Sequence, residues 1–225
     1  MTRGKSGIFM LSKSYYSHII WDWNGTLFDD VGWCVAVVNK MLAKRNMKQL
    51  DSILEYHDAF CFPVINYYKN VGFDFDKEPF DVIAKEFIAF YHAEKSGGCQ
   101  LCKNAQSVLK TMQERGKSQV ILSASETNNL LSQIDQFDIS HYFDEILGIS
   151  NIYAESKIDI GIDYMTRKKV EKAVLIGDTE HDCEVAKVLG ADCILIANGH
   201  QSKDKLLACN VPVLDDVSQV MEYIC

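Results

Sequence analysis

Short unbroken runs of hydrophobic residues recur along the chain, and longer stretches with helical periodicity separate them. The runs lie at residues 18–22, 119–122, 145–149, 173–176 and 193–197. Runs this short, without alternating polar residues, are typical of parallel strands that are covered on both faces. The pattern therefore predicts a parallel sheet built from these segments.

Helical stripes fill the intervals between the predicted strands. The clearest stripe repeats at i, i+3, i+4 and i+7 and is formed by Ala105, Val108, Leu109 and Met112. Gly116 follows this stripe and acts as a stop signal for the helix. Two further stripes cover residues 130–137 and 185–189. Strands that alternate with helices predict a doubly wound, Rossmann-like α/β sheet.

Residues 29–98 break this alternation, because they contain helical stripes and no convincing strand. Stripes at 31–42 and 80–91 flank an aromatic-rich helical segment at 56–73. Such a segment cannot extend the sheet, so it predicts a separate helical unit inserted after the first strand.

Two domains follow from this organisation. We expect an α-helical cap domain at residues 29–98 and an α/β core domain formed by residues 1–28 and 99–225. Gly97 and Gly98 would give the returning chain a flexible hinge, because glycine has unusual backbone freedom. Residues 1–16 are polar and irregular and predict a loose extension.

Composition narrows the class of protein. Hydrophobic residues make up 48% of the 225 residues and charged residues 24%, which fits a globular protein and excludes a disordered one. The net charge is −8 and no long basic block occurs, so a nucleic-acid partner is not expected. No apolar run approaches the ~20 residues that cross a bilayer, and no membrane association is expected.

The N-terminal apolar stretch is too short for a signal peptide, so we expect a soluble, cytoplasmic protein. We further expect it to be either a monomer or a homodimer. The cysteine content fits this compartment, since reduced thiols in apolar runs act as small hydrophobic side chains. Cys99 and Cys102 form one CxxC pair, but no second ligand pair stands at zinc-site spacing. A structural role is therefore favoured for both cysteines.

Polar residues follow several of the predicted strands. Asp22 comes directly after the first strand, Ser123 ends the second, and Lys157 opens a helix after a loop. Asp178 and Asp182 follow the strand at 173–176 and are one helical turn apart. Because ligands of open α/β sheets bind at the carboxyl ends of the strands, these side chains are candidates for one site. Taken singly, each of them is more readily explained as a cap, turn or surface residue.

The order of these motifs resembles the haloacid dehalogenase (HAD) superfamily, and most closely its phosphoglycolate phosphatase-like members, which carry a helical cap after the first motif. The resemblance covers about residues 18–200. The 34 residues from Ser123 to Lys157 are too few for the other cap type of the family.

The resemblance implies a role for each motif residue. Asp22 would be the nucleophile that forms an aspartyl-phosphate. Lys157 would neutralise Asp22 and the phosphate, while the Ser123 hydroxyl and the Ala124 backbone N–H would bind phosphate oxygens.

A Mg²⁺ ion is the implied cofactor, because it offsets the repulsion between a carboxylate and a dianionic phosphate. Its ligands would be Asp22, Asp178 and the backbone carbonyl of Asn24, with Asp182 holding a metal-bound water or acting from the second shell.

Asn24 departs from the pattern, since phosphatases of the family usually carry an aspartate two residues after the nucleophile. That aspartate protonates the leaving oxygen, which an amide cannot do. Loss of general acid–base help typically lowers the rate about 10²–10⁴-fold. Three interpretations are open. The enzyme would be slow or restricted to substrates with good leaving groups, or another residue would supply the proton, with His57, Glu180 and His181 as candidates. Alternatively, the protein would bind phosphate compounds without turnover.

The prediction is therefore a Mg²⁺-dependent phosphatase acting on a small, phosphoglycolate-like phosphorylated metabolite. The alternative is a catalytically weak or inactive phosphate-binding or regulatory protein of the same fold. Dehalogenase activity is disfavoured, because that reaction needs no metal whereas Asp178 and Asp182 would supply a metal site. Aromatic residues at 56–68 would either line the substrate pocket or form the core of the cap, and the core is favoured for most of them.

Overall fold

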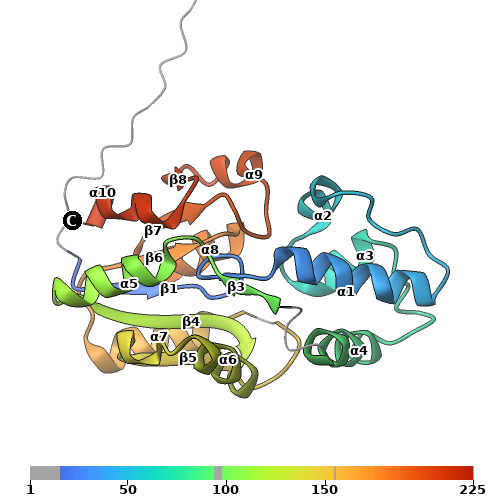
Figure 1. Cartoon of the computed structure of the whole chain (residues 1–225), viewed down its shortest axis with the longest axis horizontal. Helices are drawn as coiled ribbons and strands as arrows, with labels where there is room; N and C mark the ends of the chain where they lie inside the picture. The colour runs from blue at the N-terminus through green and yellow to red at the C-terminus, as the bar shows by residue number, and fades with distance from the viewer. Residues whose placement is uncertain (1–15, 94–97, 155, 225) are drawn as a thin grey trace, which may run out of the picture.

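The computed structural model describes residues 16–93, 98–154 and 156–224. Figure 1 shows an α/β part on the left and a helical part on the right. The predicted N-terminal extension, except for residue 16, and Gly97 of the predicted hinge lie outside the described residues.

A six-stranded parallel sheet forms the centre of the α/β part, with the strand order β5-β4-β1-β6-β7-β8. The strands are β1 (His18–Trp21), β4 (Ser118–Glu126), β5 (Glu145–Ile149), β6 (Ala173–Gly177), β7 (Asp192–Ile196) and β8 (Val213–Leu214). The doubly wound α/β prediction is confirmed. The two-residue strand β8 was not predicted, because it is too short to form a recognisable run.

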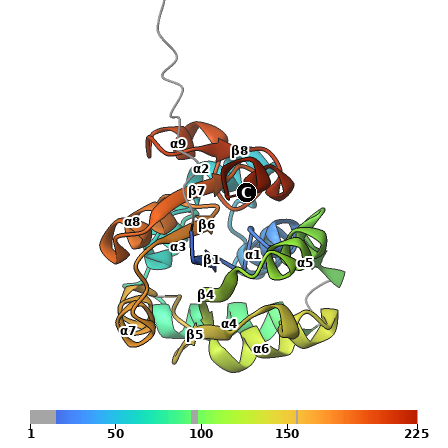
Figure 2. The ribbon, with the colours of Figure 1, turned by 90° about the vertical axis from the view of Figure 1, so that its left-hand side faces the viewer.

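Helices cover both faces of this sheet (Figure 2). Side chains alternate along a strand, so Ile19 and Trp21 face one layer of helices and Ile20 faces the other. The first layer contains α5 (Ala105–Glu114), α6 (Thr127–Ile134) and α10 (Met221–Ile224). The second contains α7 (Ile158–Lys168), α8 (Glu180–Leu189) and α9 (Lys203–Leu207).

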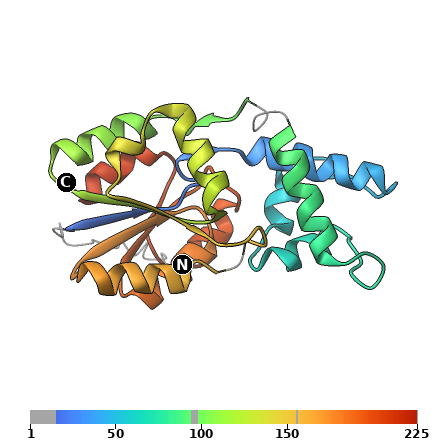
Figure 3. The same ribbon diagram turned by 90° about the horizontal axis from the view of Figure 1, so that it is seen from below.

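The helical part lies between two short strands, β2 (Phe28–Asp29) and β3 (Gln100–Leu101), which pair antiparallel. Its helices are α1 (Val31–Lys44), α2 (Ile53–Ala59), α3 (Val64–Asn70) and α4 (Phe80–Ala93). The buried residues of these helices form a hydrophobic core of their own, separate from those of the sheet. Figure 3 shows this part set beyond one end of the sheet.

Strand β4 runs further than the run at 119–122 predicts. Its pairing with β5 is regular up to Leu122 and shifts in register before Glu126. Ser123 therefore lies inside the irregular end of the strand rather than after it. Across the described ranges, no helix combines the length and the apolar character that a membrane span requires.

Candidate active site

The carboxyl ends of β1, β4 and β6 meet at the boundary between the sheet and the helical part, and a cavity of about 170 Å³ lies there. Every site residue predicted from the sequence lines this cavity: Asp22, Asn24, Ser123, Ala124, Lys157, Asp178 and Asp182. The structure thus brings together residues from four separate segments of the chain.

Three carboxylates form the floor of the cavity. Asp22, Asp178 and Asp182 each place an oxygen atom within 4.8 Å of the other two. The Lys157 ammonium lies between Asp22 and Asp182. It donates a hydrogen bond to Asp22 Oδ1 and lies 2.7 Å from Asp182 Oδ1. The Lys157 side chain is only 2% exposed, so its charge acts on these carboxylates with little screening by water.

Local structure fixes Asp182. Thr179 is the N-cap of α8, and Asp182 is the third residue of that helix, so the two form a capping box. Asp182 Oδ2 accepts hydrogen bonds from the Thr179 hydroxyl at 2.7 Å and from the Thr179 N–H at 3.0 Å. The capping geometry leaves Oδ1 for Lys157.

Asp178 is fixed by two segments that are distant in sequence. Its Oδ1 accepts a hydrogen bond from the Thr26 hydroxyl at 3.1 Å, and its Oδ2 accepts one from the His200 backbone N–H at 2.6 Å. Thr26, in the turn after Asp22, therefore orients a carboxylate of the floor.

Glycines make room for these carboxylates. A Cβ atom at Gly199 would lie 2.0 Å from Asp178 Oδ2, and one at Gly25 would lie 2.4 Å from the same atom. Gly25 also has a φ of +74°, which other residues rarely adopt. Any larger residue at either position would displace the Asp178 carboxylate.

The charges of the floor are out of balance. Burial raises the pKa of Asp22 to about 6, although Lys157 opposes the shift. Burial also raises the pKa of Asp178 to about 8. Burial acts in the same direction on Asp182, but Lys157 outweighs it and lowers the pKa of that carboxyl overall. The floor therefore has too little positive charge for three buried carboxylates.

A divalent cation fits this arrangement. The three carboxylates would carry three negative charges and Lys157 carries one positive charge, so a doubly charged ion brings the group to neutrality. All the convergent donors are oxygen atoms, which Mg²⁺ prefers, and hydrogen bonds from Thr26 and His200 hold Asp178 in place. Asp22, Asp178 and Asp182 are the residues that would hold the ion.

Ser125 connects the predicted phosphate-binding segment to Asn24. Its hydroxyl donates a hydrogen bond to Asn24 Oδ1 at 2.7 Å, and its backbone N–H donates one to Ser123 Oγ at 3.1 Å. The amide nitrogen of Asn24 donates to Asp30 Oδ2 at 2.8 Å. Both ends of the Asn24 side chain are thus engaged, which fixes its orientation.

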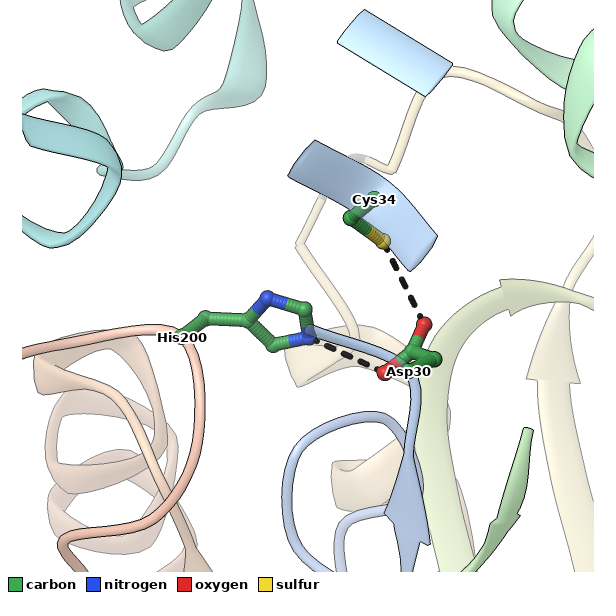
Figure 4. Close-up of side chains that lie close together, drawn as sticks. All are labelled: Asp30, Cys34 and His200. Atoms are coloured by element: carbon green, nitrogen blue, oxygen red, sulfur yellow. Dashed lines mark hydrogen bonds and ion pairs between the residues drawn. The ribbon is translucent and has the colours of Figure 1, made fainter. Parts of the chain in front are cut away.

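Asp30 is the centre of a buried network that the sequence did not predict. Its Oδ2 also accepts hydrogen bonds from Tyr91 at 2.7 Å and from Cys34 at 3.4 Å. His200 Nε2 lies 3.3 Å from Asp30 Oδ1 (Figure 4). Burial lowers the pKa of His200, but Asp30 outweighs it and raises the pKa to about 9.

This network joins the two parts of the molecule. Tyr91 belongs to α4 and Cys34 to α1, whereas His200 lies in the loop after β7. The Tyr56 hydroxyl of α2 lies 2.6 Å from His200 Nδ1. Asp30, Cys34 and His200 could also be regarded as metal ligands by their spacing. The hydrogen bonds and the ion pair around Asp30 account for that spacing without a metal.

The three candidates for an alternative proton donor are placed differently. His181 lines the cavity, its ring stacks on Phe62 at 4.6 Å between centroids, and its Nε2 is buried with no partner among the described residues. His57 and Glu180 do not line the cavity within the described part of the chain.

The helical part supplies a second, apolar half of the cavity. Its lining side chains are mainly aromatic or aliphatic, namely Val38, Tyr56, Phe60, Phe62, Val64, Tyr67, Tyr68, Phe80, Ala84, Phe87, Ile88 and Tyr91. Several of these aromatic residues are also buried in the core of the helical part. The same aromatic residues therefore line the cavity and form the core of the helical part, the two roles considered from the sequence.

Sequence reasoning missed Asp30, Ser125 and the His200 side chain. From the sequence, Asn198-Gly199-His200 resembles a loop beside the active site, and His200 is interpreted as a loop residue rather than a catalyst. Its position after Asn198-Gly199, where a polar loop follows a buried strand, was the one signal available. Asp30 gave no signal, because an acid at the start of a helix usually interacts with the helix dipole.

Comparison with known proteins identifies the family of this chain. Residues 19–196 match the haloacid dehalogenase-like hydrolase family. The chain is 21% identical over 219 residues to a phosphoglycolate phosphatase from Pseudomonas savastanoi pv. phaseolicola, a match that covers 90% of this chain and 78% of the relative.

Solved structures share the fold at low identity. A predicted phosphatase from Clostridium acetobutylicum superimposes with a TM-score of 0.80 at 20% identity, covering 94% of this chain and 99% of that one. A haloacid dehalogenase-like family hydrolase from Streptococcus pneumoniae gives a TM-score of 0.82 at 19% identity, covering 93% and 99% of the two chains.

Proposed function

The chain belongs to the haloacid dehalogenase-like hydrolase family, and we propose that it is a Mg²⁺-dependent phosphatase that hydrolyses a small phosphomonoester. The resemblance inferred from the sequence is confirmed by the family match, and relatives of similar length are named as phosphatases. The observation that carries the proposal is the floor of the cavity, where Asp22, Asp178 and Asp182 converge on one point beside Lys157.

The reaction would proceed in two displacements. An Asp22 carboxylate oxygen forms a bond to phosphorus, and the bond between phosphorus and the ester oxygen breaks with its electrons on that oxygen. Water then attacks the phosphorus of the aspartyl-phosphate, gives up a proton to solvent, and releases phosphate from Asp22. The alcohol takes up one proton and the water loses one, so the sum is hydrolysis of the ester.

Side chains of this chain would hold the phosphoryl group during both steps. Lys157 offsets the charge of Asp22. The Ser123 hydroxyl and the Ala124 N–H would bind oxygens of the phosphoryl group, because both residues line the cavity beside Asp22. When bound, Mg²⁺ would supply the positive charge that polarises these oxygens.

The helical part would exclude bulk water from the first step. Contacts from the α/β part reach it at several points. Lys205 in α9 donates hydrogen bonds to the carbonyl oxygens of His57 and Asp58 at 2.8 Å, which lie near the end of α2. Gln201 donates to the Phe60 carbonyl at 3.3 Å. These contacts would keep the cavity closed over a substrate.

A second candidate function is binding of a phosphorylated ligand without turnover. The observation that favours it is Asn24, whose amide is held between Ser125 and Asp30 and cannot act as a general acid. Metal and phosphate would still bind in such a protein, since neither needs an acid at this position.

Phosphate release from p-nitrophenyl phosphate separates the two functions. The wild-type protein should release phosphate with Mg²⁺ and stop when EDTA is added, and Asp22→Asn should lower the rate by at least about 10³-fold. Asp163→Asn, at an exposed carboxylate on α7, is the matched control and should be unaffected. Absence of release, with Mg²⁺-dependent binding of a phosphate analogue, would establish the binding function instead.

A further inference from the structure

We propose that the substrate is an aryl phosphate, the phosphomonoester of a small and uncharged phenol, rather than a phosphorylated carboxylic acid such as phosphoglycolate. This inference rests on the proposed phosphatase function and adds the chemical class of the group that leaves. Three independent features of the cavity support it: the nature of its helical half, its charge balance, and the residue at position 24.

The helical half of the cavity suits a flat apolar group. Phe62, Tyr67, Phe87 and Ile88 are among the side chains that line it. Aromatic side chains pack against another ring edge-to-face or in an offset stack. The cavity volume of about 170 Å³ covers both the charged floor and the apolar half. A phosphoryl group with a small leaving group suits this volume better than a nucleotide or a long chain.

The cavity has no positive charge to spare for a second anionic group. Lys157 is the one lysine or arginine that lines it among the described residues, and Asp22 and Asp182 occupy its ammonium. His200 is paired with Asp30. His92 and His181 also line the cavity, but they are imidazoles rather than permanent cations. A divalent cation and Lys157 would already face the three carboxylates and the phosphoryl group, so a substrate carboxylate in the apolar half would have no permanent cation as its partner.

The lysine and arginine side chains in and next to α1 and α4 are engaged elsewhere, and the Lys40 ammonium lies 4.4 Å from the centre of the Phe90 ring. Arg45 forms ion pairs with Glu78 and Glu86, and Lys44 contacts Glu86. Lys85 pairs with Asp81 on the same helix. Glu126, which lines the cavity from the end of β4, would repel a carboxylate further. A second anionic group would therefore be buried unpaired, which is costly.

Asn24 adds a requirement on the leaving group. Its amide cannot protonate the ester oxygen, so position 24 supplies no proton and an ester whose oxygen leaves readily as an anion is favoured. A phenol has a pKa of about 10, far below the value of about 15.7 for water. The electron pair of the broken bond is thus far better accommodated on a phenolic oxygen than on an alkoxide.

Steady-state kinetics with three esters test the inference. Phenyl phosphate, cyclohexyl phosphate and 2-phosphoglycolate are compared by kcat/KM for phosphate release with Mg²⁺. Phenyl phosphate should exceed phosphoglycolate by at least about tenfold, through KM because phosphoglycolate carries a carboxylate and through kcat because its leaving group is an alkoxide. It should also exceed cyclohexyl phosphate, which has a ring of similar size but a poor leaving group, mainly through kcat.

A variant locates the preference in the cavity wall. Ile88→Lys places an ammonium in the apolar half and should raise kcat/KM for phosphoglycolate while lowering it for phenyl phosphate. Val82→Lys makes the same change on α4 at a side chain that is 46% exposed, and should alter neither value.

The outcomes separate this inference from the proposed function. If phosphoglycolate is hydrolysed as well as phenyl phosphate or better, or if Ile88→Lys leaves the ratio unchanged, the aryl assignment is wrong and the phosphatase stands. If Mg²⁺ produces no hydrolysis of any ester, including p-nitrophenyl phosphate, the proposed function itself is wrong.

Discussion

The two halves of the cavity are built on opposite principles. The half formed by the sheet has three buried carboxylates, a buried ammonium and fixed hydrogen bonds around each. The half formed by the helices presents aromatic and aliphatic surface. Charged groups at the sheet would suit the proposed phosphoryl transfer, whereas the apolar surface would suit the proposed leaving group. The comparison teaches that, under this proposal, reaction type and substrate choice depend on different parts of the chain.

The buried network around Asp30 connects the halves. It takes Asn24 and His200 from the sheet side and Tyr91 and Cys34 from the helical side. Gln133 extends it, accepting a hydrogen bond from Trp23 at 2.8 Å and donating one to Tyr91 at 3.3 Å. The position of the helices over the sheet is thus coupled to the orientation of Asn24.

The largest effect is expected on the charged half, from Lys157→Met. Loss of the ammonium leaves Asp22 and Asp182 without their buried partner, so phosphate release should fall by at least about 10³-fold. Lys168→Met removes a lysine that pairs with Glu145 at the surface and should leave the rate within about twofold. Comparable losses in both variants would show that the buried position of Lys157 has no special importance.

Asn24→Asp combined with Asp30→Asn should produce the next largest effect. The double variant restores the usual acid and keeps one carboxylate and one amide in contact, so hydrolysis of cyclohexyl phosphate should rise by about 10²-fold. Asn24→Asp alone places two carboxylates in contact and should gain less. A single variant that is faster than the double variant would contradict this role for Asp30.

Much of the fold and of the site could be predicted before the structure. The strands β5 and β6 carry short, mainly apolar runs, and Asp178 directly follows β6. Local patterns of this kind are visible in sequence because the residues that define them are neighbours. The contact of Asp30 with His200 joins segments that are far apart in the chain, so no pattern of hydrophobic and polar residues indicates it. The irregular end of β4, which places Ser123 within the strand, depends on its pairing with β5 and was missed for the same reason.

Tyr91→Phe tests the connection between the halves. It removes the hydroxyl that donates to the buried Asp30 carboxylate, which should lower the free energy of unfolding by about 1.5–3 kcal/mol in urea titrations. Tyr223→Phe is the control, because Tyr223 lies in α10 and does not line the cavity. Equal stability of Tyr91→Phe and the wild-type protein would mean that the network does not hold the helices to the sheet.

The smallest effect is expected from a surface ion pair of the α/β part. Arg167, with Lys168, lowers the pKa of Glu145 to about 2. Because the folded-state pKa lies below the usual value near 4.5, the pair stabilises the protein above about pH 4.5 and loses this contribution as the pH falls towards 2. Arg167 and Glu145 are both exposed to water, which screens the pair, so the contribution to stability is small.

Unfolding of wild type and Glu145→Gln at pH 7 and pH 3 measures this contribution. The difference between the two proteins should be largest at pH 7 and should shrink at pH 3. A difference that grows at low pH would have the wrong sign for a depressed carboxyl pKa.

The convergence of the three carboxylates on one divalent cation is tested most directly by titrating the protein with Mg²⁺ in a calorimeter. The wild-type protein should bind one ion, Asp178→Asn should lose that binding, and Asp163→Asn should keep it. Binding by Asp178→Asn with wild-type affinity and stoichiometry would contradict the account, because the floor of the cavity would then not be the metal site.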